Sequence, residues 1–348
     1  MKVLWKVARP ILAVTLGLTL GLLVAWIAGE NPLHVLRILG KSAFGSTYDI
    51  GMSLAYAIPL IFTGLSVSLA FHAGLFNIGA EGQLTLGALA AAAVGSAFPG
   101  IPWPAAPILA GLAAFTAGAL WGAIPGWLKA HRGSHEVINT MMMNFVAAGL
   151  ASWVTLYLLR NPDTQNPETR VVGSNYLLTH LPFFGDAPVS TAIFIALGAA
   201  LLAGVFLWRT VKGFEVRATG QSERAARYAG VRVERIYPLI MALAGGMAGL
   251  VGVAEVLGHA GKFKLGFSPD YGFLGIAVAL LGRNHPAGVV AAACLFGALH
   301  KGTADLDLET EKMTREVSLI LQAFIILCVS ADGIWDHLER KRRRIDHE

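Results

Sequence analysis

The chain has 348 residues, of which 55 % are hydrophobic and only 14 % are charged. Its 40 glycines bring the apolar-plus-glycine share to about two-thirds, against about half in soluble domains. This composition excludes a disordered chain and argues against an ordinary soluble enzyme, because so much apolar surface needs lipid to cover it. The net charge of +5 does not indicate nucleic-acid binding, since the basic residues flank apolar runs.

The apolar runs predict an all-α, polytopic membrane protein with about ten transmembrane helices. The expected spans are residues 10–29, 54–72, 76–98, 104–128, 137–159, 189–208, 237–258, 272–282, 286–300 and 316–333. The first run is long for a signal-peptide core, so we expect it to be retained as a helix. The runs at 272–282 and 286–300 are short, and they could be full spans or a broken, re-entrant pair.

The distribution of lysine and arginine predicts the orientation. With ten spans and a cytoplasmic N-terminus, 18 of the 27 basic residues fall on the cytoplasmic side and 9 on the other. The positive-inside rule therefore favours N-in and C-in. We expect one transmembrane domain over residues 1–348, with a cytoplasmic loop at 212–236, an extracytoplasmic loop at 161–188 and a basic cytoplasmic tail at 335–348.

Two partial motifs do not amount to catalytic sites. Leu39-Gly40-Lys41-Ser42 ends like a phosphate-binding loop, but Val35 stands where the motif needs a glycine. His135-Glu136 begins like a zinc-binding helix, but Asn139 replaces the second histidine. We therefore expect no catalytic residue, no metal and no cofactor held by this chain, and energy supplied by an ion gradient or another subunit.

The segment from Phe71 to Gln83 joins two predicted spans on the expected cytoplasmic side. Its glycines lie among three polar residues, Asn77, Glu81 and Gln83, which suggests a tight turn entering the membrane. An ionised carboxylate at membrane depth costs about 2.5–3.5 kcal/mol on insertion scales, so such a group usually faces a partner or water. Asn77, Glu81 and Gln83 are therefore candidates for the substrate pathway, and for Glu81 the alternative is capping of a helix N-terminus.

Three further polar residues lie in apolar helical runs. Asn139 and Asn144 belong to the run from His135 to Asn144, and they either bind neighbouring helices together or line a substrate route. Glu255, in Val253-Ala-Glu-Val-Leu257, is a second candidate in-membrane carboxylate, and its alternatives are a packing hydrogen bond or interfacial exposure.

The stretch from Lys212 to Arg235 is predicted to carry a short cytoplasmic helix. Ser222 can cap a helix from Glu223 to about Ala229, and Gly230 can end it. Ala225 and Ala226 have small side chains, so one face of this helix would carry no protruding groups. Arg217 is one of the arginines around the helix. Such a helix suits docking into the groove of a partner protein, while the alternative is a solvated loop bound to anionic lipid.

Four segments together resemble one family. Gly74-Leu-Phe-Asn-Ile-Gly-Ala-Glu-Gly-Gln83 is similar to the signature of permeases in bacterial ABC importers of the simple-sugar and branched-chain amino-acid class. His135-Glu-Val-Ile-Asn-Thr-Met-Met-Met-Asn144 resembles the nucleoside-type permeases that work with basic-membrane-lipoprotein binding proteins. The segments 217–230 and 272–286 also resemble that subfamily, and the resemblance extends from about residue 30 to 335.

The resemblance implies a transport subunit without its own ATPase site, in the bacterial cytoplasmic (inner) membrane. Its implied partners are a second permease, identical or paralogous, two cytoplasmic ATP-binding subunits that use the ATP, and an extracytoplasmic solute-binding lipoprotein. The implied solute is a small polar molecule, most simply a nucleoside, moved by alternating access. By the same resemblance the docking helix couples to the ATPase through Arg217, Gly220, Glu223, Ala225, Ala226 and Gly230.

Three alternatives remain open on the sequence. The chain could be a simple-sugar permease of the same class. It could be a secondary transporter driven by an ion gradient, with Glu81 and Glu255 as proton sites. It could also be a membrane scaffold that transports nothing.

Overall fold

The computed structural model describes residues 2–310, 319–320, 323–324 and 327–328, with side chains from residue 12 onward. Its regular structure in this part of the chain is helical, and the only β-type pairings there are three isolated bridges. The predicted all-helical class is therefore confirmed. The last predicted span, 316–333, falls largely outside the described residues, and the basic tail at 335–348 falls entirely outside them.

The chain divides into two compact units. The first comprises Met1–Ser53 together with Ala298–Glu348, and the second comprises Leu54–Gly297. Two helices, α3 (Thr47–His72) and α12 (Pro286–Glu309), contribute one end to each unit.

The first unit contains α1 (Lys2–Ile27) and α2 (Pro32–Phe44), together with the ends of α3 and α12. The α2 helix is amphipathic and was not among the predicted spans. It begins where the Asn31 side chain accepts a hydrogen bond from the Leu33 N–H (2.9 Å), with Pro32 in the first turn. Its buried face includes Val35, Ile38 and Leu39.

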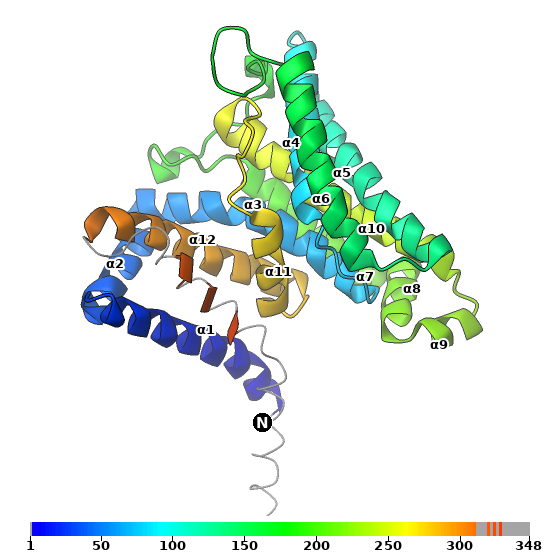
Figure 1. The fold of residues 1–348 in the computed structure, drawn as a ribbon, viewed down its shortest axis with the longest axis horizontal. Helices are drawn as coiled ribbons and strands as arrows, with labels where there is room; N and C mark the ends of the chain where they lie inside the picture. Colours follow the sequence, from blue (N-terminus) through cyan, green and yellow to red (C-terminus); the bar gives the residue numbers. More distant parts are fainter. Residues whose placement is uncertain (1, 311–318, 321–322, 325–326, 329–348) are drawn as a thin grey trace, which may run out of the picture. The chain divides into compact units, whose positions relative to one another are not determined.

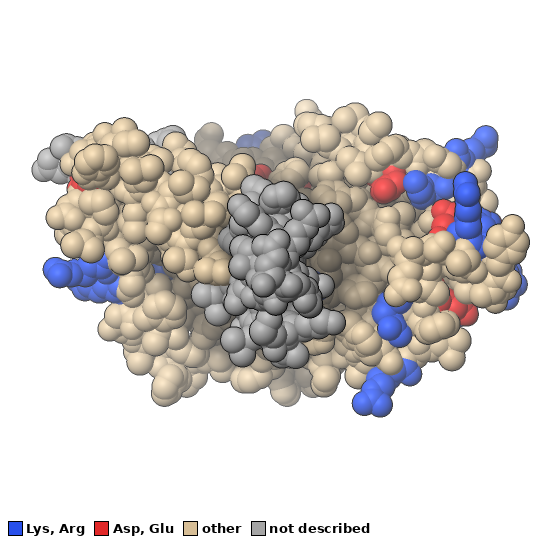
Figure 2. All heavy atoms as spheres, turned by 90° about the horizontal axis from the view of Figure 1, so that it is seen from below, with Lys and Arg blue, Asp and Glu red and all other residues tan. Residues whose placement is uncertain are grey.

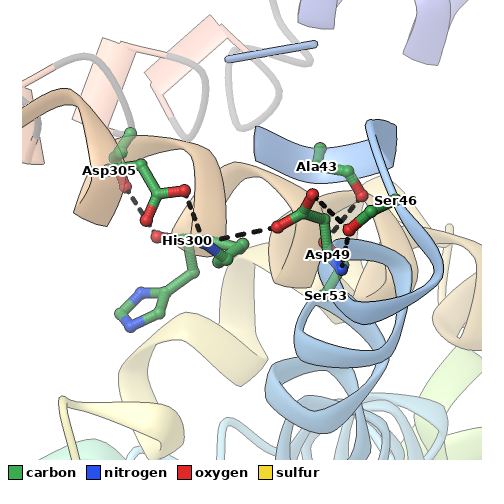
Figure 3. A network of polar contacts seen from close by, with 8 residues as sticks. Ala43, Ser46, Asp49, Ser53, His300 and Asp305 are labelled. Carbon is green, nitrogen blue, oxygen red and sulfur yellow. Dashed lines mark hydrogen bonds and ion pairs between the residues drawn. The ribbon is translucent and has the colours of Figure 1, made fainter. Parts of the chain in front are cut away.

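A charged network connects α3 and α12 within the first unit (Figure 3). Lys301 is buried, and its ammonium forms ion pairs with Asp305 on the same helix and with Asp49 on α3 (3.8 Å). The Ser46 hydroxyl donates to Asp49 (2.7 Å), and the Ser53 hydroxyl donates to the Ala43 carbonyl (3.1 Å). The buried lysine is thus neutralised by two carboxylates, as the cost of burying a charge requires.

The second unit contains the rest of the helices (Figure 1). In chain order they are the end of α3, α4 (Ala80–Ala97), α5 (Ala105–Arg132), α6 (Glu136–Trp153), α7 (Ala192–Arg209), α8 (Val211–Gln221), α9 (Glu223–Tyr228), α10 (Val233–Gly249), α11 (Tyr271–Leu281) and the start of α12. Two π-helical segments extend α6 over Val154–Leu158 and α10 over Val253–Ala260.

In the second unit α5 and α10 pack closely over much of their length and run side by side (Figure 1). Glycines make this approach possible. A Cβ added to Gly118 would lie 2.2 Å from the Gly245 carbonyl oxygen, and one added to Gly122 would lie 2.4 Å from that of Met241. Gly87 of α4 meets Gly249 of α10 in the same way. Glycines on α4, α5 and α10 therefore let these helices pack closely, as expected for helices in lipid.

Each predicted span before residue 310 coincides with a helix. Six helices among the described residues are long and apolar enough to cross a membrane, and the described part of α1 and α11 are shorter apolar helices. The α11 helix has 11 residues, whereas α12 has 24 and extends beyond the expected end at residue 300. The extension carries the charged residues Lys301, Asp305, Asp307 and Glu309. Because these residues interrupt the apolar run, the predicted span ends before the helix does.

The loop between α6 and α7 is held by an ion pair and by a buried tyrosine. Glu168 is buried, and its carboxylate accepts a hydrogen bond from the Lys262 ammonium (2.7 Å). The Tyr176 side chain is also buried, and its hydroxyl donates to the Phe98 carbonyl (2.9 Å). This loop is therefore an ordered part of the second unit.

Candidate functional site

Asn77 and Gln83 form a buried bracket at the turn between α3 and α4. The Asn77 amide donates to the Gln83 side-chain oxygen (2.8 Å) and to the Ser66 hydroxyl (3.0 Å). The Gln83 amide donates back to the Asn77 oxygen (3.1 Å). Both side chains are almost completely inaccessible to solvent. These two candidates therefore fix the turn, and in this structure their amides are occupied by one another and by Ser66.

Asn144 holds α6 to the start of α4. Its side-chain oxygen accepts a hydrogen bond from the Gly82 N–H (2.8 Å), and its amide donates to the Ile78 carbonyl (3.0 Å). A Cβ on Gly82 would lie 2.9 Å from the Ala147 side chain and 3.0 Å from the Asn144 oxygen. The small residue is thus what lets the two helices meet at this point.

Glu81 lies in the first turn of α4 and binds the first turn of α11. Its carboxylate accepts a hydrogen bond from the Gly272 N–H (2.7 Å), and the Ser268 side chain lies beside it. A Cβ on Gly272 would lie 2.4 Å from the Glu81 nitrogen. The carboxylate therefore satisfies an N–H at the N-terminus of α11 that has no partner within that helix.

A cavity of about 220 Å³ opens beside Glu81. Its walls come from α4, α6 and the segment that follows the π-helical end of α10. The polar lining comprises Glu81, Thr85, Asn144, Ser152 and Ser268, and Phe267 is among the apolar residues. The structure thus brings two of the predicted pathway residues, Glu81 and Asn144, to one cavity.

The other two pathway candidates lie elsewhere. The Asn139 amide donates to the Ser134 hydroxyl (2.7 Å), a local contact at the start of α6. Glu255 lies in the π-helical segment, with a carboxylate oxygen 3.7 Å from the His259 Nδ1. Neither residue lines the cavity beside Glu81.

The predicted short helix is confirmed as α9. The Ser222 hydroxyl accepts a hydrogen bond from the Ala225 N–H (3.3 Å), and Gly230 follows the helix with a left-handed φ of 86°. Its two alanines differ in orientation, because Ala226 is 3 % exposed whereas Ala225 is exposed. The outward surface includes Tyr228, which is 94 % exposed.

An ion-pair network joins α9 to the start of α10. Arg227 pairs with Glu223 (3.0 Å) and with Glu234, and the Tyr237 hydroxyl donates to Glu223 (2.9 Å). The Tyr237 hydroxyl, followed by Arg227, lowers the pKa of the Glu223 carboxyl below its ordinary value. Lysine and arginine side chains mixed with acidic ones gather at the end of the second unit where α8 and α9 lie (Figure 2).

The α8 helix is fixed to the α3–α4 turn through Gly220. A Cβ on Gly220 would lie 2.2 Å from the His72 carbonyl oxygen and 2.9 Å from the Gly74 nitrogen. Arg217 contributes by donating from Nε to the Leu207 carbonyl at the end of α7 (3.0 Å). The candidates Arg217, Gly220 and Ala226 therefore make internal contacts that hold α8 and α9, whereas Arg224, Ala225 and Tyr228 are exposed.

Sequence reasoning missed several residues at these sites. It assigned no role to Ser66, Ser152 or Tyr237, and it quoted Gly272 only as part of a resembling segment. A glycine at the second position of a short apolar helix was the one available signal of a close approach. In the part of the chain that is described, no three His, Cys, Asp or Glu side chains are grouped so as to hold a metal ion.

The fold and the site define a multi-pass membrane protein in which several polar side chains, among them Asn77 and Gln83, are buried within a helical bundle. A family described as the permease component of branched-chain amino acid transport systems matches residues 50–330, and the chain belongs to that family. It is therefore a permease, as the sequence motifs predicted.

Three characterised relatives match almost the whole chain. The guanosine ABC transporter permease protein NupP of Bacillus subtilis (strain 168) is 38 % identical over 93 % of this chain and 93 % of its own length. The glucose ABC transporter permease protein TsgB13 of Haloferax volcanii is 36 % identical over 91 % of this chain and 85 % of its own length. The nucleoside ABC transporter permease protein NupB of Lactococcus lactis subsp. cremoris is 32 % identical over 98 % of this chain and 95 % of its own length. No solved structure matches the chain.

Proposed function

We propose that this permease is the transmembrane subunit of an ATP-driven importer of nucleosides in the bacterial inner membrane. The observation that carries the proposal is the similarity to NupP and NupB, which are named for guanosine and nucleoside transport and align along 93 % and 98 % of this chain. The glucose permease TsgB13 supports a simple sugar as the second candidate solute.

The proposed mechanism is alternating access driven from outside the chain. Two ATP-binding subunits close on ATP, and their motion enters through α8 and α9 in the cytoplasmic segment 212–236. It passes to the α3–α4 turn, because Gly220 of α8 packs directly against His72 and Gly74. A lipoprotein delivers the solute from the other side, so the permease pathway needs only weak affinity.

The proposed assembly also contains a second permease and places both termini in the cytoplasm, with about ten spans. The chain itself needs no bound cofactor, because ATP is hydrolysed by its partners. The loop at 161–188 would face the lipoprotein.

The test is uptake by proteoliposomes that contain the complete transporter, assembled from this chain with its ATP-binding subunits, second permease and lipoprotein. We expect uptake of radiolabelled guanosine that requires ATP and is not reduced by excess glucose. Competition by glucose would instead identify a sugar importer. Gradient-driven uptake by this chain alone would identify a secondary transporter, and ATPase binding without any uptake would identify a scaffold.

A further inference from the structure

The cavity beside Glu81 lies along α6, away from the polar start of that helix. The polar start of α6 is marked by the Lys129–Glu136 ion pair (2.9 Å). Asn144, which binds the residue after Glu81, comes eight residues later, and at 1.5 Å per residue this places it about 12 Å along the helix. The Glu81 carboxylate therefore lies beside the interior of a helix that is long and apolar enough to cross a membrane, and not beside its polar start.

Lipid is a poor occupant for this cavity. A carboxylate at membrane depth is costly unless it faces a water-filled space or a polar partner. Acyl chains offer no hydrogen-bond donors, whereas the lining presents Glu81, Thr85, Ser152 and Ser268. The polar part of the lining therefore suits water or a polar solute better than an acyl chain.

Part of this polar lining has unused hydrogen-bonding capacity. A carboxylate has about four acceptor positions. The Gly272 N–H takes one of those on Glu81, and the adjacent Ser268 side chain accounts for at most one more. The Ser152 hydroxyl forms no hydrogen bond to the described residues. Asn144, by contrast, already uses both its side-chain oxygen and its amide nitrogen in hydrogen bonds within the chain, and it acts by positioning α4.

We propose that this cavity is the solute-binding site of the permease, where Glu81 accepts hydrogen bonds from two adjacent donors on one ring of the solute. The proposal rests on the proposed function and adds the site and its chemistry. Pockets that enclose a whole drug-sized ligand usually measure about 300–1,000 Å³. A volume of about 220 Å³ therefore suits one ring of a nucleoside. The paired donors are either the vicinal hydroxyls of a ribose or the N1–H and amino group of a guanine.

The first experiment measures access and occupancy without measuring transport. In the assembled transporter with Cys294 and Cys328 replaced by alanine, Ser152→Cys is treated with a small cationic methanethiosulfonate. We expect rapid modification that saturating guanosine slows at least fivefold. Val146→Cys on the same helix is the matched control, because residue 146 is 55 % exposed but does not line the cavity, and it should react slowly with no protection.

The second experiment identifies the donors. ATP-driven uptake of guanosine, 2′,3′-dideoxyguanosine and inosine is compared in the wild type and in Glu81→Gln, with the same lipoprotein. We expect Glu81→Gln to lower guanosine uptake about tenfold. If Glu81 binds the ribose hydroxyls, the variant should also lose the wild-type preference for guanosine over 2′,3′-dideoxyguanosine. If Glu81 binds the guanine edge, the variant should instead lose the preference for guanosine over inosine. Glu81→Asp keeps the charge and should recover part of the preference.

The outcomes separate this proposal from the proposed function. If the wild type moves guanosine but residue 152 is unreactive or unprotected, or Glu81→Gln keeps both preferences, the cavity is not the solute site. If the wild type moves glucose and not guanosine, the nucleoside assignment fails. Protection of residue 152 by glucose would then support the site, and lack of protection would overturn it.

Discussion

At the scale of single residues, Asn144 makes two hydrogen bonds that join α6 to the start of α4. Asn144→Ala leaves the Gly82 N–H and the Ile78 carbonyl without their partner. An unsatisfied buried polar group costs about 1–3 kcal/mol, so we expect the variant to lose at least about 2 kcal/mol of stability. The measurement is the melting temperature of the purified protein in detergent. Asn139→Ala is the control, because the hydrogen bond of Asn139 to Ser134 is local. Equal melting temperatures for the two variants would contradict the role of Asn144 in holding α6 to α4.

Glu168 gives a pH-dependent prediction. The hydrogen bond from Lys262 lowers the pKa of its carboxyl below the ordinary value. A carboxyl whose pKa is lower in the folded state than in the unfolded state stabilises the fold at pH values above the unfolded-state pKa, which is about 4.3 for glutamate. This stabilisation is lost as the pH falls through the folded-state pKa. We expect wild type to melt above Glu168→Gln at pH 7, with the difference shrinking below about pH 5.

The matched control for Glu168 is Glu215→Gln. The Glu215 carboxylate pairs with Lys212 three residues earlier on the same helix, and more than half of the lysine side chain is exposed. Exposed pairs contribute little, so this variant should melt like wild type at every pH. A difference between wild type and Glu168→Gln that stays constant from pH 7 to pH 3 would show that ionisation of Glu168 does not matter.

At the scale of helices, the α5–α10 contact depends on the absence of side chains. Gly118→Ala would place a Cβ within 2.2 Å of the Gly245 carbonyl oxygen, so one of the helices must shift. Overpacking of this kind costs about 1–3 kcal/mol. Gly149→Ala is the matched control, since nothing lies within 4 Å of its Cβ position, and it should gain about 0.5–1 kcal/mol. The melting temperatures of the two variants should therefore move in opposite directions.

The exposed and buried sides of α9 lead to different variants. Tyr228 is 94 % exposed, so Tyr228→Ala should leave the melting temperature unchanged. If α9 docks on the ATPase, the same variant should weaken binding of that subunit at least tenfold, as loss of an aromatic anchor does. Ala226→Leu, at a buried position, should instead lower the melting temperature. Unchanged ATPase binding by Tyr228→Ala would remove this residue from the docking surface.

The same elements show what the sequence could predict. Ser222 and Gly230 marked both ends of α9 because capping acts over three or four neighbouring residues. The inward orientation of Ala226 depends on what packs beneath the helix, so local sequence could not predict it. The contact of Asn144 with Gly82 joins residues 62 positions apart, and that of Glu81 with Gly272 joins residues 191 apart. Residue type suggested these side chains, but only the fold pairs them.

At the scale of the whole molecule, apolar length located the helices better than their ends. The predicted span 286–300 belongs to a 24-residue helix whose last turns carry Lys301 and Asp305. Hydropathy underestimates such a helix, because an ion pair within the protein lets charged residues remain in a buried helix end. The same limit applies to α2. Its polar face lowers the mean hydropathy of the segment, so this helix is not among the predicted spans.

The predicted orientation can be tested across α7 alone. Residues 186 and 228 flank this one long apolar helix, so they must lie on opposite sides of the membrane if α7 spans it. The arginines and lysines between residues 209 and 235 place position 228 in the cytoplasm by the positive-inside rule. With Cys294 and Cys328 replaced by alanine, an impermeant maleimide should label Asp186→Cys in intact cells and Tyr228→Cys only in inside-out vesicles. Labelling of both positions in intact cells would show that α7 does not cross, and the reversed pattern would invert the whole topology and separate α9 from any cytoplasmic ATPase.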